Sequence, residues 1–154
     1  MVKYNDHPLY CFLSPEEKKL LQPIVKSQSF MAHETIINLG ERNRDIICLE
    51  EGSVSIQVED FEGNVNEVTR IHSGNLVGEM NFIIPTRRTA NVVALTFGEA
   101  DIIPFAKLCS LLKEYPLLAE KIFSALSLQL KDKYLGMINA WNYVFNRMPN
   151  SNSA

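Results

Sequence analysis

The sequence is poor in the residues and segments that tie a protein to a membrane, a disulfide framework or a secretory route. Its three cysteines, Cys11, Cys48 and Cys109, are odd in number and widely separated, which is typical of reduced thiols in a cytoplasmic protein. The apolar runs are far shorter than the about 20 residues that a membrane-spanning helix needs, so we expect no membrane partner. The opening residues, Met1–Pro8, have no apolar core of a secretory signal.

The net charge and the spacing of potential metal ligands argue against further classes of protein. The net charge is −3 and the pI is about 5.6, so the basic field of a DNA-binding protein is missing and we expect no DNA partner. No Cys-x-x-Cys or His-x-His pair occurs, so we expect no metal site and no cofactor. No serine or cysteine has a visible base partner, and Glu50-Glu51 before Gly52 is more typical of a turn than of a catalytic pair. An enzyme is therefore not expected.

The chain is interpreted as a single domain over residues 1–148, followed by a polar tail, 149–154, that we expect to be disordered. The first zone is helical and starts at Ser14-Pro15-Glu16-Glu17. In this pattern Ser14 caps the helix, the proline takes the first helical position, and Glu17 completes a capping box. Pro23 limits this helix.

The middle zone, about 29–103, holds short apolar and β-branched stretches separated by glycines. Residues 54–58 alternate as a half-buried strand does. The expected strands cover residues 35–37, 46–49, 54–58, 65–71, 90–95 and 100–103, with a hairpin turn at 62–64. Many short strands at close spacing predict a mostly β domain with flanking helices, built as a jelly-roll β-barrel.

The last zone, about 105–147, is predicted to hold a short helix and then one long helix from Pro116. The long helix carries a single apolar stripe, formed by Ile122, Leu126, Leu130, Tyr134, Ile138, Trp141 and Phe145. A continuous helix of this length would extend beyond a compact body and expose the end of its stripe, so we expect a homodimer packed along it. A bend at Gly136 that folds the helix back to give a monomer is the alternative.

Residues 74–90 carry the chemistry of the chain. Gly74 and Gly78 allow tight turns and a close approach of backbone to a ligand. Arg88 offers a guanidinium fork that matches two phosphate oxygens. Glu79 only accepts hydrogen bonds, so it must face a donor such as a sugar hydroxyl. An anion and a hydroxyl on one small ligand indicate a nucleotide.

This segment resembles the phosphate-binding cassette of the cyclic nucleotide-binding domain family, which includes catabolite activators, protein kinase A regulatory subunits and cyclic-nucleotide-gated channels. The family pattern is Gly-x-x-Phe-Gly-Glu, an apolar turn, then Arg, a small or hydroxyl residue and Ala. The nine-residue spacing from Glu79 to Arg88 and the sequence Arg-Arg-Thr-Ala at 87–90 agree with it. The resemblance covers about residues 12–135.

The resemblance implies a role for each matching residue. Glu79 would accept from the ribose 2′-hydroxyl, and Arg88 would bind the cyclic phosphate. Thr89 would lie beside phosphate and base, where its hydroxyl can favour guanine. Backbone contacts to the ligand are implied for Gly78 and Ala90, and Met80 belongs to the same set. From the C-terminal helix, Lys133 and Tyr134 are candidate lid residues.

Three departures from the family pattern stand in the sequence. Val77 replaces the usual phenylalanine, and His33 takes the place of a turn glycine. Asn81 replaces a small residue in the turn beneath the phosphate, where it would crowd the pocket or add an amide ligand. The resemblance implies a stand-alone sensor of cAMP or cGMP that signals to a protein partner through its C-terminal helices. The alternative, favoured by Asn81, is a jelly-roll interaction module that no longer binds nucleotide.

Overall fold

The computed structural model describes residues 7–146, and for residues 134, 136, 137 and 140–145 it describes the backbone alone. Two short 3₁₀ helices lie near the start, η1 (Pro8–Tyr10) and η2 (Gln22–Ile24). The α-helices are α1 (Pro15–Leu21), α2 (Met80–Ile83), α3 (Phe105–Glu114) and α4 (Pro116–Phe145). The strands are β1 (Lys26–Phe30), β2 (Thr35–Ile37), β3 (Ile46–Glu51), β4 (Ser53–Glu59), β5 (Val65–His72), β6 (Leu76–Val77), β7 (Asn91–Ala94) and β8 (Gly98–Ile103). The predicted tail, 149–154, lies outside the described residues.

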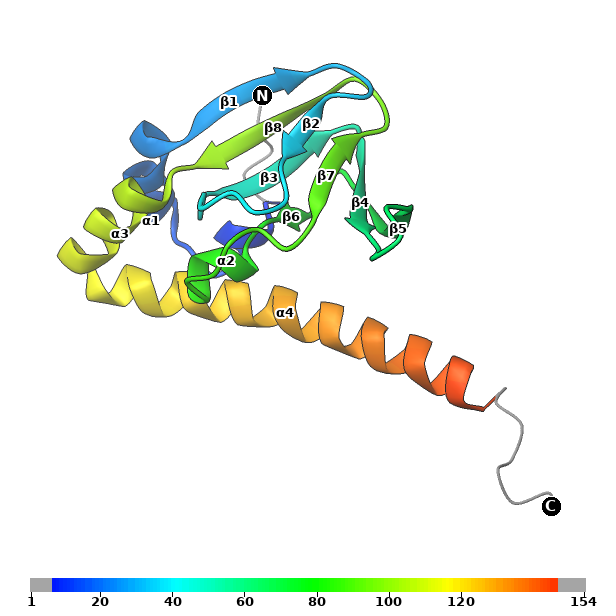
Figure 1. The fold of residues 1–154 in the computed structure, drawn as a ribbon. Coiled ribbons are helices and arrows are strands. Elements are labelled where there is room, and N and C mark those ends of the chain that lie inside the picture. The colour runs from blue at the N-terminus through cyan, green and yellow to red at the C-terminus, as the bar shows by residue number, and fades with distance from the viewer. Residues whose placement is uncertain (1–6, 147–154) are drawn as a thin grey trace.

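The strands form two four-stranded antiparallel sheets, in the orders β1-β8-β3-β6 and β2-β7-β4-β5. This confirms the predicted jelly roll with flanking helices. The two sheets are separate and are not closed into a barrel, so the barrel in the prediction is replaced by an open sandwich. Figure 1 shows the sandwich on one side of α4, with α1 and α3 at one end.

Two strands were not predicted, and both have a physical reason. β1 reads Lys-Ser-Gln-Ser-Phe, and only Phe30 is buried, so its alternation is weak. It is an edge strand held by β8 through main-chain pairing from Lys26 to Phe30. β6 is only two residues long and pairs with Ile47 and Cys48 of β3. Such a strand is too short for any periodicity to reveal it.

The first helix follows its local sequence. The Glu17 amide donates to the Ser14 hydroxyl at 3.2 Å, and the Ser14 amide donates to the Glu17 carboxylate at 3.0 Å. This is the predicted capping box, and it satisfies two amides that the helix cannot satisfy internally. The helix ends at Leu21 and continues as η2 through Pro23, as the proline predicted.

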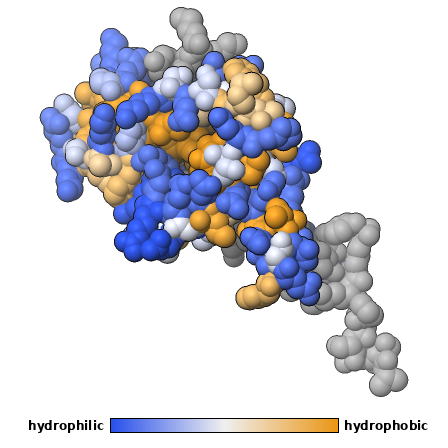
Figure 2. Space-filling model, turned by 45° about the horizontal axis from the view of Figure 1, so that its top comes forward, coloured by the Kyte–Doolittle hydropathy of each residue, from blue (hydrophilic) through white to orange (hydrophobic). Residues whose placement is uncertain are grey.

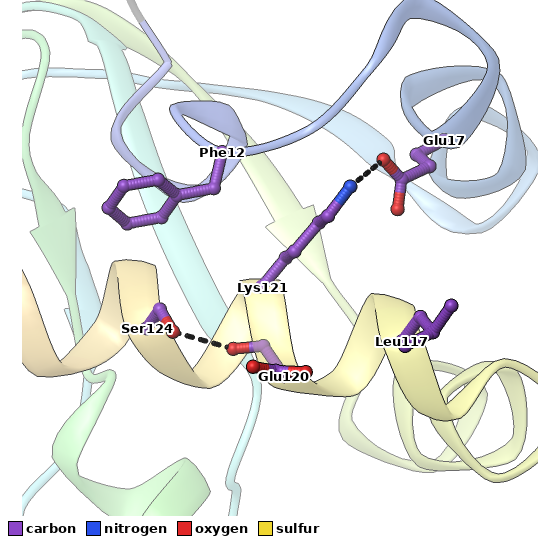
Figure 3. Close-up of a pocket in the computed structure, with 6 residues that line it drawn as sticks. All are labelled: Phe12, Glu17, Leu117, Glu120, Lys121 and Ser124. Carbon is purple, nitrogen blue, oxygen red and sulfur yellow. Dashed lines mark hydrogen bonds and ion pairs between the residues drawn. The ribbon is translucent and has the colours of Figure 1, made fainter.

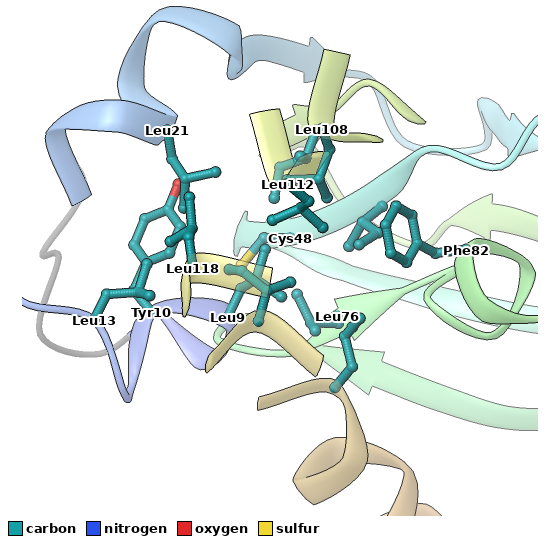
Figure 4. Packing of buried hydrophobic residues seen from close by; sticks show 14 residues of the cluster. Leu9, Tyr10, Leu13, Leu21, Cys48, Leu76, Phe82, Leu108, Leu112 and Leu118 are labelled. Carbon is teal, nitrogen blue, oxygen red and sulfur yellow. The ribbon is translucent and has the colours of Figure 1, made fainter. Parts of the chain in front are cut away.

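Two apolar clusters hold the molecule together. One lies inside the sandwich and includes Phe30, Leu49 and Val54. The other lies between β3, β6 and the helices, where Leu9 of η1, Leu108 of α3 and side chains of α4 meet around Cys48. Figure 4 shows these side chains converging from opposite ends of the chain. The N-terminal turn, α3 and α4 are therefore fixed to one face of the first sheet.

The long helix is continuous from Pro116 to Phe145 and passes through Gly136 without a break. Ile122 and Leu126 are fully buried, so the first half of the predicted stripe packs on the sandwich. Figure 1 shows the second half of α4 running past the strands. The side chains of three residues of the predicted stripe, Tyr134, Trp141 and Phe145, lie outside the described residues, whereas Ile138 is half-buried.

The surface is mixed in polarity. Figure 2 shows apolar residues in a recess of the face turned toward the viewer, with hydrophilic residues around it. Among the described residues, no helix combines the length and apolar character needed to cross a bilayer.

Candidate functional site

The cassette is a tight connection between β6 and α2. Gly78 has φ +76°, in the left-handed region that favours glycine. A Cβ at this position would lie 2.4 Å from the Nη1 atom of Arg88. Position 78 therefore requires glycine for two reasons: its backbone conformation, and the guanidinium group that occupies the space of a Cβ atom.

Glu79 follows this glycine and is buried, with 1% of its surface exposed. Its carboxylate forms an ion pair with the ammonium group of Lys133 in α4. The same ammonium lies 3.5 Å from the carbonyl oxygen of Leu76. The carboxylate predicted to accept from a sugar hydroxyl is thus paired with a cation from the C-terminal helix.

Arg88 is also buried, with 3% of its surface exposed. Its Nη1 donates to the Gly78 carbonyl at 2.8 Å and to the Asn81 amide oxygen at 3.3 Å. Its Nη2 donates to the Asn43 side chain at 2.9 Å and to the Asp45 carbonyl at 2.8 Å. Burial lowers the pKa of this guanidinium, and nearby carboxylates, first among them Asp45, oppose that shift.

The Nε atom of Arg88 is buried and has no hydrogen-bond partner in the described part of the chain. A buried donor without an acceptor is costly, by about 1–3 kcal/mol. The guanidinium predicted to bind a phosphate therefore donates to protein acceptors from both terminal nitrogens, while its third nitrogen, Nε, has no acceptor.

Asn81 holds the cassette loop closed. Its amide nitrogen donates to the Thr86 carbonyl at 2.8 Å and lies 3.3 Å from the Arg87 carbonyl, while its oxygen accepts from Arg88. The side chain is 8% exposed. The Asn81 amide therefore acts inside the loop, where its nitrogen and its oxygen are both bonded to protein groups and a small residue would leave space.

The cassette is joined to both C-terminal helices. Phe82 of α2 packs edge-on against Phe105 of α3, with ring centroids 5.5 Å apart, and lies 6.1 Å from the ring of Phe123 of α4. Arg44 donates to the Asn81 and Phe82 carbonyls and stacks on Phe105 at 4.0 Å. A shift of α2 would therefore be felt directly by α3 and α4.

The remaining predicted residues line the same connection. Met80 and Thr89 are exposed, whereas Gly78 and Ala90 are half-buried. Arg87 is exposed and donates to the Gly40 carbonyl at 3.0 Å. The side chain of Tyr134, the second lid candidate, lies outside the described residues.

Sequence reasoning missed the loop that holds Arg88 from the other side. Asn43, Arg44 and Asp45 contribute four of the bonds that fix the cassette, and Asp45 also accepts from the amide of Phe105 at 2.8 Å. The only available signal was a run of polar residues directly before an apolar strand. Which distant residues such a run contacts depends on the pairing of the strands.

A pocket of about 550 Å³ lies away from the cassette, between the N-terminal segment, α1 and α4 (Figure 3). It is lined by Phe12, Glu17, Leu117, Glu120, Lys121 and Ser124. Its cation and carboxylate are paired with each other, since Lys121 contacts Glu17 at 2.5 Å. The pocket contains none of the predicted site residues, and we assign it no function.

A family model described as cyclic nucleotide-binding domain matches residues 27–115, more than half of the chain. The chain belongs to this family. A search of curated proteins found no match. The family assignment fits the cassette, which lies within the matched range together with the loop that holds Arg88.

Solved structures agree on the fold. A cyclic nucleotide-binding domain from Methylobacillus flagellatus has a TM-score of 0.82 at 16% identity, covering 97% of this chain and 86% of that one. The N-terminal domain of a Streptomyces coelicolor transcriptional regulator has a TM-score of 0.72 at 20% identity, covering 96% of both chains.

A third similar structure is a triple variant of the regulatory subunit of a cAMP-independent protein kinase A from Trypanosoma brucei, bound to cAMP in the A site. It has a TM-score of 0.62 at 26% identity and covers 72% of this chain and 43% of that one. This chain therefore spans under half the length of that relative.

Proposed function

We propose that this protein is a sensor of a cyclic nucleotide, cAMP or cGMP, and that binding is read out by the position of its C-terminal helix. One observation carries the proposal. Glu79 and Arg88 are both buried, Glu79 directly after Gly78 and Arg88 with its guanidinium bonded to the Gly78 carbonyl, and Lys133 of α4 is paired with Glu79. The two groups that the family uses for ribose and phosphate are therefore kept together, and one of them is bonded to the element that would transmit the signal.

The proposed mechanism is an exchange of partners. The ribose 2′-hydroxyl donates to Glu79 in place of Lys133, and the cyclic phosphate accepts from Arg88, beginning with the unsatisfied Nε donor. Because the hydroxyl replaces the Lys133 ammonium at Glu79, α4 loses the ion pair that holds it to the cassette. The helix then shifts against α2 through the Phe82–Phe123 contact.

The trypanosome comparison supports the use of an arginine in this exchange. The protein named cAMP-independent is bound to cAMP in a variant in which three residues are replaced, one of them by arginine. Small changes in such a domain are thus compatible with gain of the ligand. Here the arginine of the cassette pattern is already present at position 88.

Thermal unfolding with added cAMP or cGMP tests the proposal. A ligand that binds only the folded state raises stability by RT ln(1 + [L]/Kd), so saturating nucleotide raises the Tm. Arg88→Ala should weaken Kd by roughly 30- to several-thousand-fold, because loss of one member of a buried charged pair costs about 2–5 kcal/mol. Arg87→Ala is the matched control and should bind as the wild type does. Equal binding by both variants would mean that the cassette register is wrong.

A second candidate function is the interaction module without ligand. The bonds from Asn81 to the loop and to Arg88 favour it, because they occupy groups that a phosphate would need. In this case neither nucleotide shifts the Tm of the wild type, whereas Asn81→Ala, which removes the amide, creates binding. Binding of either nucleotide by the wild type would exclude this candidate.

We also propose that α4 mediates a homodimer and contacts the downstream protein partner. Leu128 and Leu135 on α4 are 41% and 47% exposed, and the helix continues past the sandwich (Figure 1). Light scattering at micromolar concentration checks this: a dimer mass is expected, and a monomer mass at all concentrations would exclude it. No contribution of DNA or a membrane is proposed.

A further inference from the structure

Three potential metal ligands meet where the N-terminal turn covers β3, away from the cassette. One imidazole nitrogen of His7, the Sγ atom of Cys48 and a carboxylate oxygen of Glu50 all lie within 4.8 Å of one another. His7 comes from the segment before η1, and the other two side chains come from alternate positions of one strand. Their spacing in the sequence did not predict this group, because it depends on the N-terminal turn lying over the sheet.

Two of the three side chains are buried, Glu50 is half-buried, and the group is incompletely bonded. His7 is 4% exposed and Cys48 is 1% exposed. The His7 ring stacks on Tyr10 at 3.9 Å, and its Nδ1 accepts from the Leu9 amide at 3.2 Å. Its Nε2 is buried and has no hydrogen-bond partner among the described residues. Because Nδ1 accepts, the neutral ring carries its proton on Nε2, so this nitrogen is a buried donor without an acceptor and the group is incomplete on that side.

A fourth potential ligand, an oxygen donor, lies beside these three. Asp101 of β8 is paired with Cys48 across the sheet and is 5% exposed. Its carboxyl forms a hydrogen bond with that of Glu50. A thiol, an imidazole and two carboxyls from three segments of the chain thus lie together.

We propose that His7, Cys48 and Glu50, with Asp101 as the fourth ligand, bind a divalent transition metal, Zn²⁺ being the best match. Mixed sulfur, nitrogen and oxygen donors in a four-coordinate arrangement are typical of zinc, whereas Mg²⁺ and Ca²⁺ take oxygen donors. On binding, the Cys48 thiol and the carboxyl pair of Glu50 and Asp101 release their protons to solvent, and the thiolate and carboxylates bond to the metal.

The geometry requires only a short adjustment. Zinc–ligand bonds of about 2.0–2.3 Å place tetrahedral ligand atoms roughly 3.5 Å apart, so the ligand atoms of His7, Cys48 and Glu50, which lie within 4.8 Å of one another, close in by up to about 1.3 Å. Coordination by Nε2 puts the ring proton on Nδ1, so the Leu9 amide gives up its bond to that atom. The metal would tie the N-terminal segment to β3, and this gives the site a structural role.

Cobalt titration of the full chain tests the site. The reduced protein is stripped with a chelator, dialysed and titrated with Co²⁺. One equivalent should give a thiolate-to-cobalt charge-transfer band that added Zn²⁺ removes. Cys48→Ser should abolish the band, and Cys11→Ser, which changes an exposed cysteine, should keep it. Absence of the band, or its loss in the Cys11 variant instead, overturns the proposal.

Thermal unfolding with Zn²⁺ gives a second measurement in case Cys48→Ser fails to fold. The wild type should gain Tm, and His7→Asn and Glu50→Gln should bind more weakly than the wild type by at least the roughly 10–100-fold that loss of an outer-shell partner costs. His33→Asn, which changes an exposed histidine, is the control. Equal zinc affinity in the wild type, the His7 variant and the Glu50 variant excludes this site.

Discussion

The ion pair between Glu79 and Lys133 is the contact on which the proposed coupling depends. Lys133→Met keeps the stem of the side chain and removes its charge. Glu79 is then left buried without its cation, with 1% of its side chain exposed, whereas the lysine side chain is 38% exposed. Breaking a fully buried pair costs about 3–5 kcal/mol. Because one partner is open to solvent, we expect a smaller loss of about 1–2 kcal/mol in the free energy of unfolding.

The same pair should oppose the nucleotide. If the ribose must displace Lys133, the free energy of the pair is subtracted from the binding energy, and the variant should bind cyclic nucleotide roughly 5- to 30-fold more tightly than the wild type. The variant is therefore expected to be less stable when empty and to have a higher affinity. A purely structural contact would lower stability without raising affinity.

Urea unfolding and calorimetric titration measure the two effects. The single variants Lys133→Met and Glu79→Gln and their double variant form a cycle, and the coupling energy should be about 1–2 kcal/mol in the empty protein. Lys131→Met, which changes an exposed lysine on the same helix, is the control. Weaker nucleotide binding by Lys133→Met would refute the displacement, since it would mean that the lysine contacts the ligand.

Three further changes test the fold and its electrostatics. Gly78→Ala should destabilise more than Gly40→Ala in urea unfolding: both glycines have positive φ, but only the added Cβ at 78 meets the guanidinium, and equal losses would contradict this packing. The ion pair with Lys121 of α4 lowers the pKa of Glu17, so the stabilisation from this pair is present above the ordinary pKa of a glutamate and is lost as pH falls. Glu17→Gln should therefore flatten the acid side of the profile of stability against pH, and an unchanged profile would contradict the pair. Burial and the Asp101 carboxylate raise the pKa of Glu50 to about 7, so metal-free protein should lose stability as pH rises from about 4.5 to 7, and Glu50→Gln should remove that loss in thermal unfolding.

Local sequence determined the elements whose signals lie within a few residues. The capping box from Ser14 to Glu17 formed as predicted, because both of its hydrogen bonds join residues three apart. The alternation of residues 54–58 predicted β4, and the glycine at 78 predicted a tight turn that its positive φ bears out. The resemblance carried by residues 74–90 indicated the family, which the family model confirms.

Only the tertiary structure decided what each of these residues contacts. Glu79 and Lys133 are 54 positions apart, and their pairing requires α4 to cross the cassette. Arg88 matched the family motif, yet two of its acceptors come from Asn43 and Asp45, which reach it through the pairing of β3 within the sheet. Hydrophobic periodicity identifies the face that a helix buries, but the register of that helix along the sandwich depends on packing over the whole molecule.

The grouping of His7, Cys48 and Glu50 shows the same division. Alternation along β3 places Cys48 and Glu50 on one face, a relation that the sequence alone determines. His7 joins them because η1 packs on the cluster around Leu9, and nothing in the local pattern fixes that contact. Hydrogen bonds between near neighbours and the alternation of side chains along a strand depend on a few consecutive residues. The neighbours of a buried polar group depend on how the whole chain buries its apolar surface, so only the complete fold determines them.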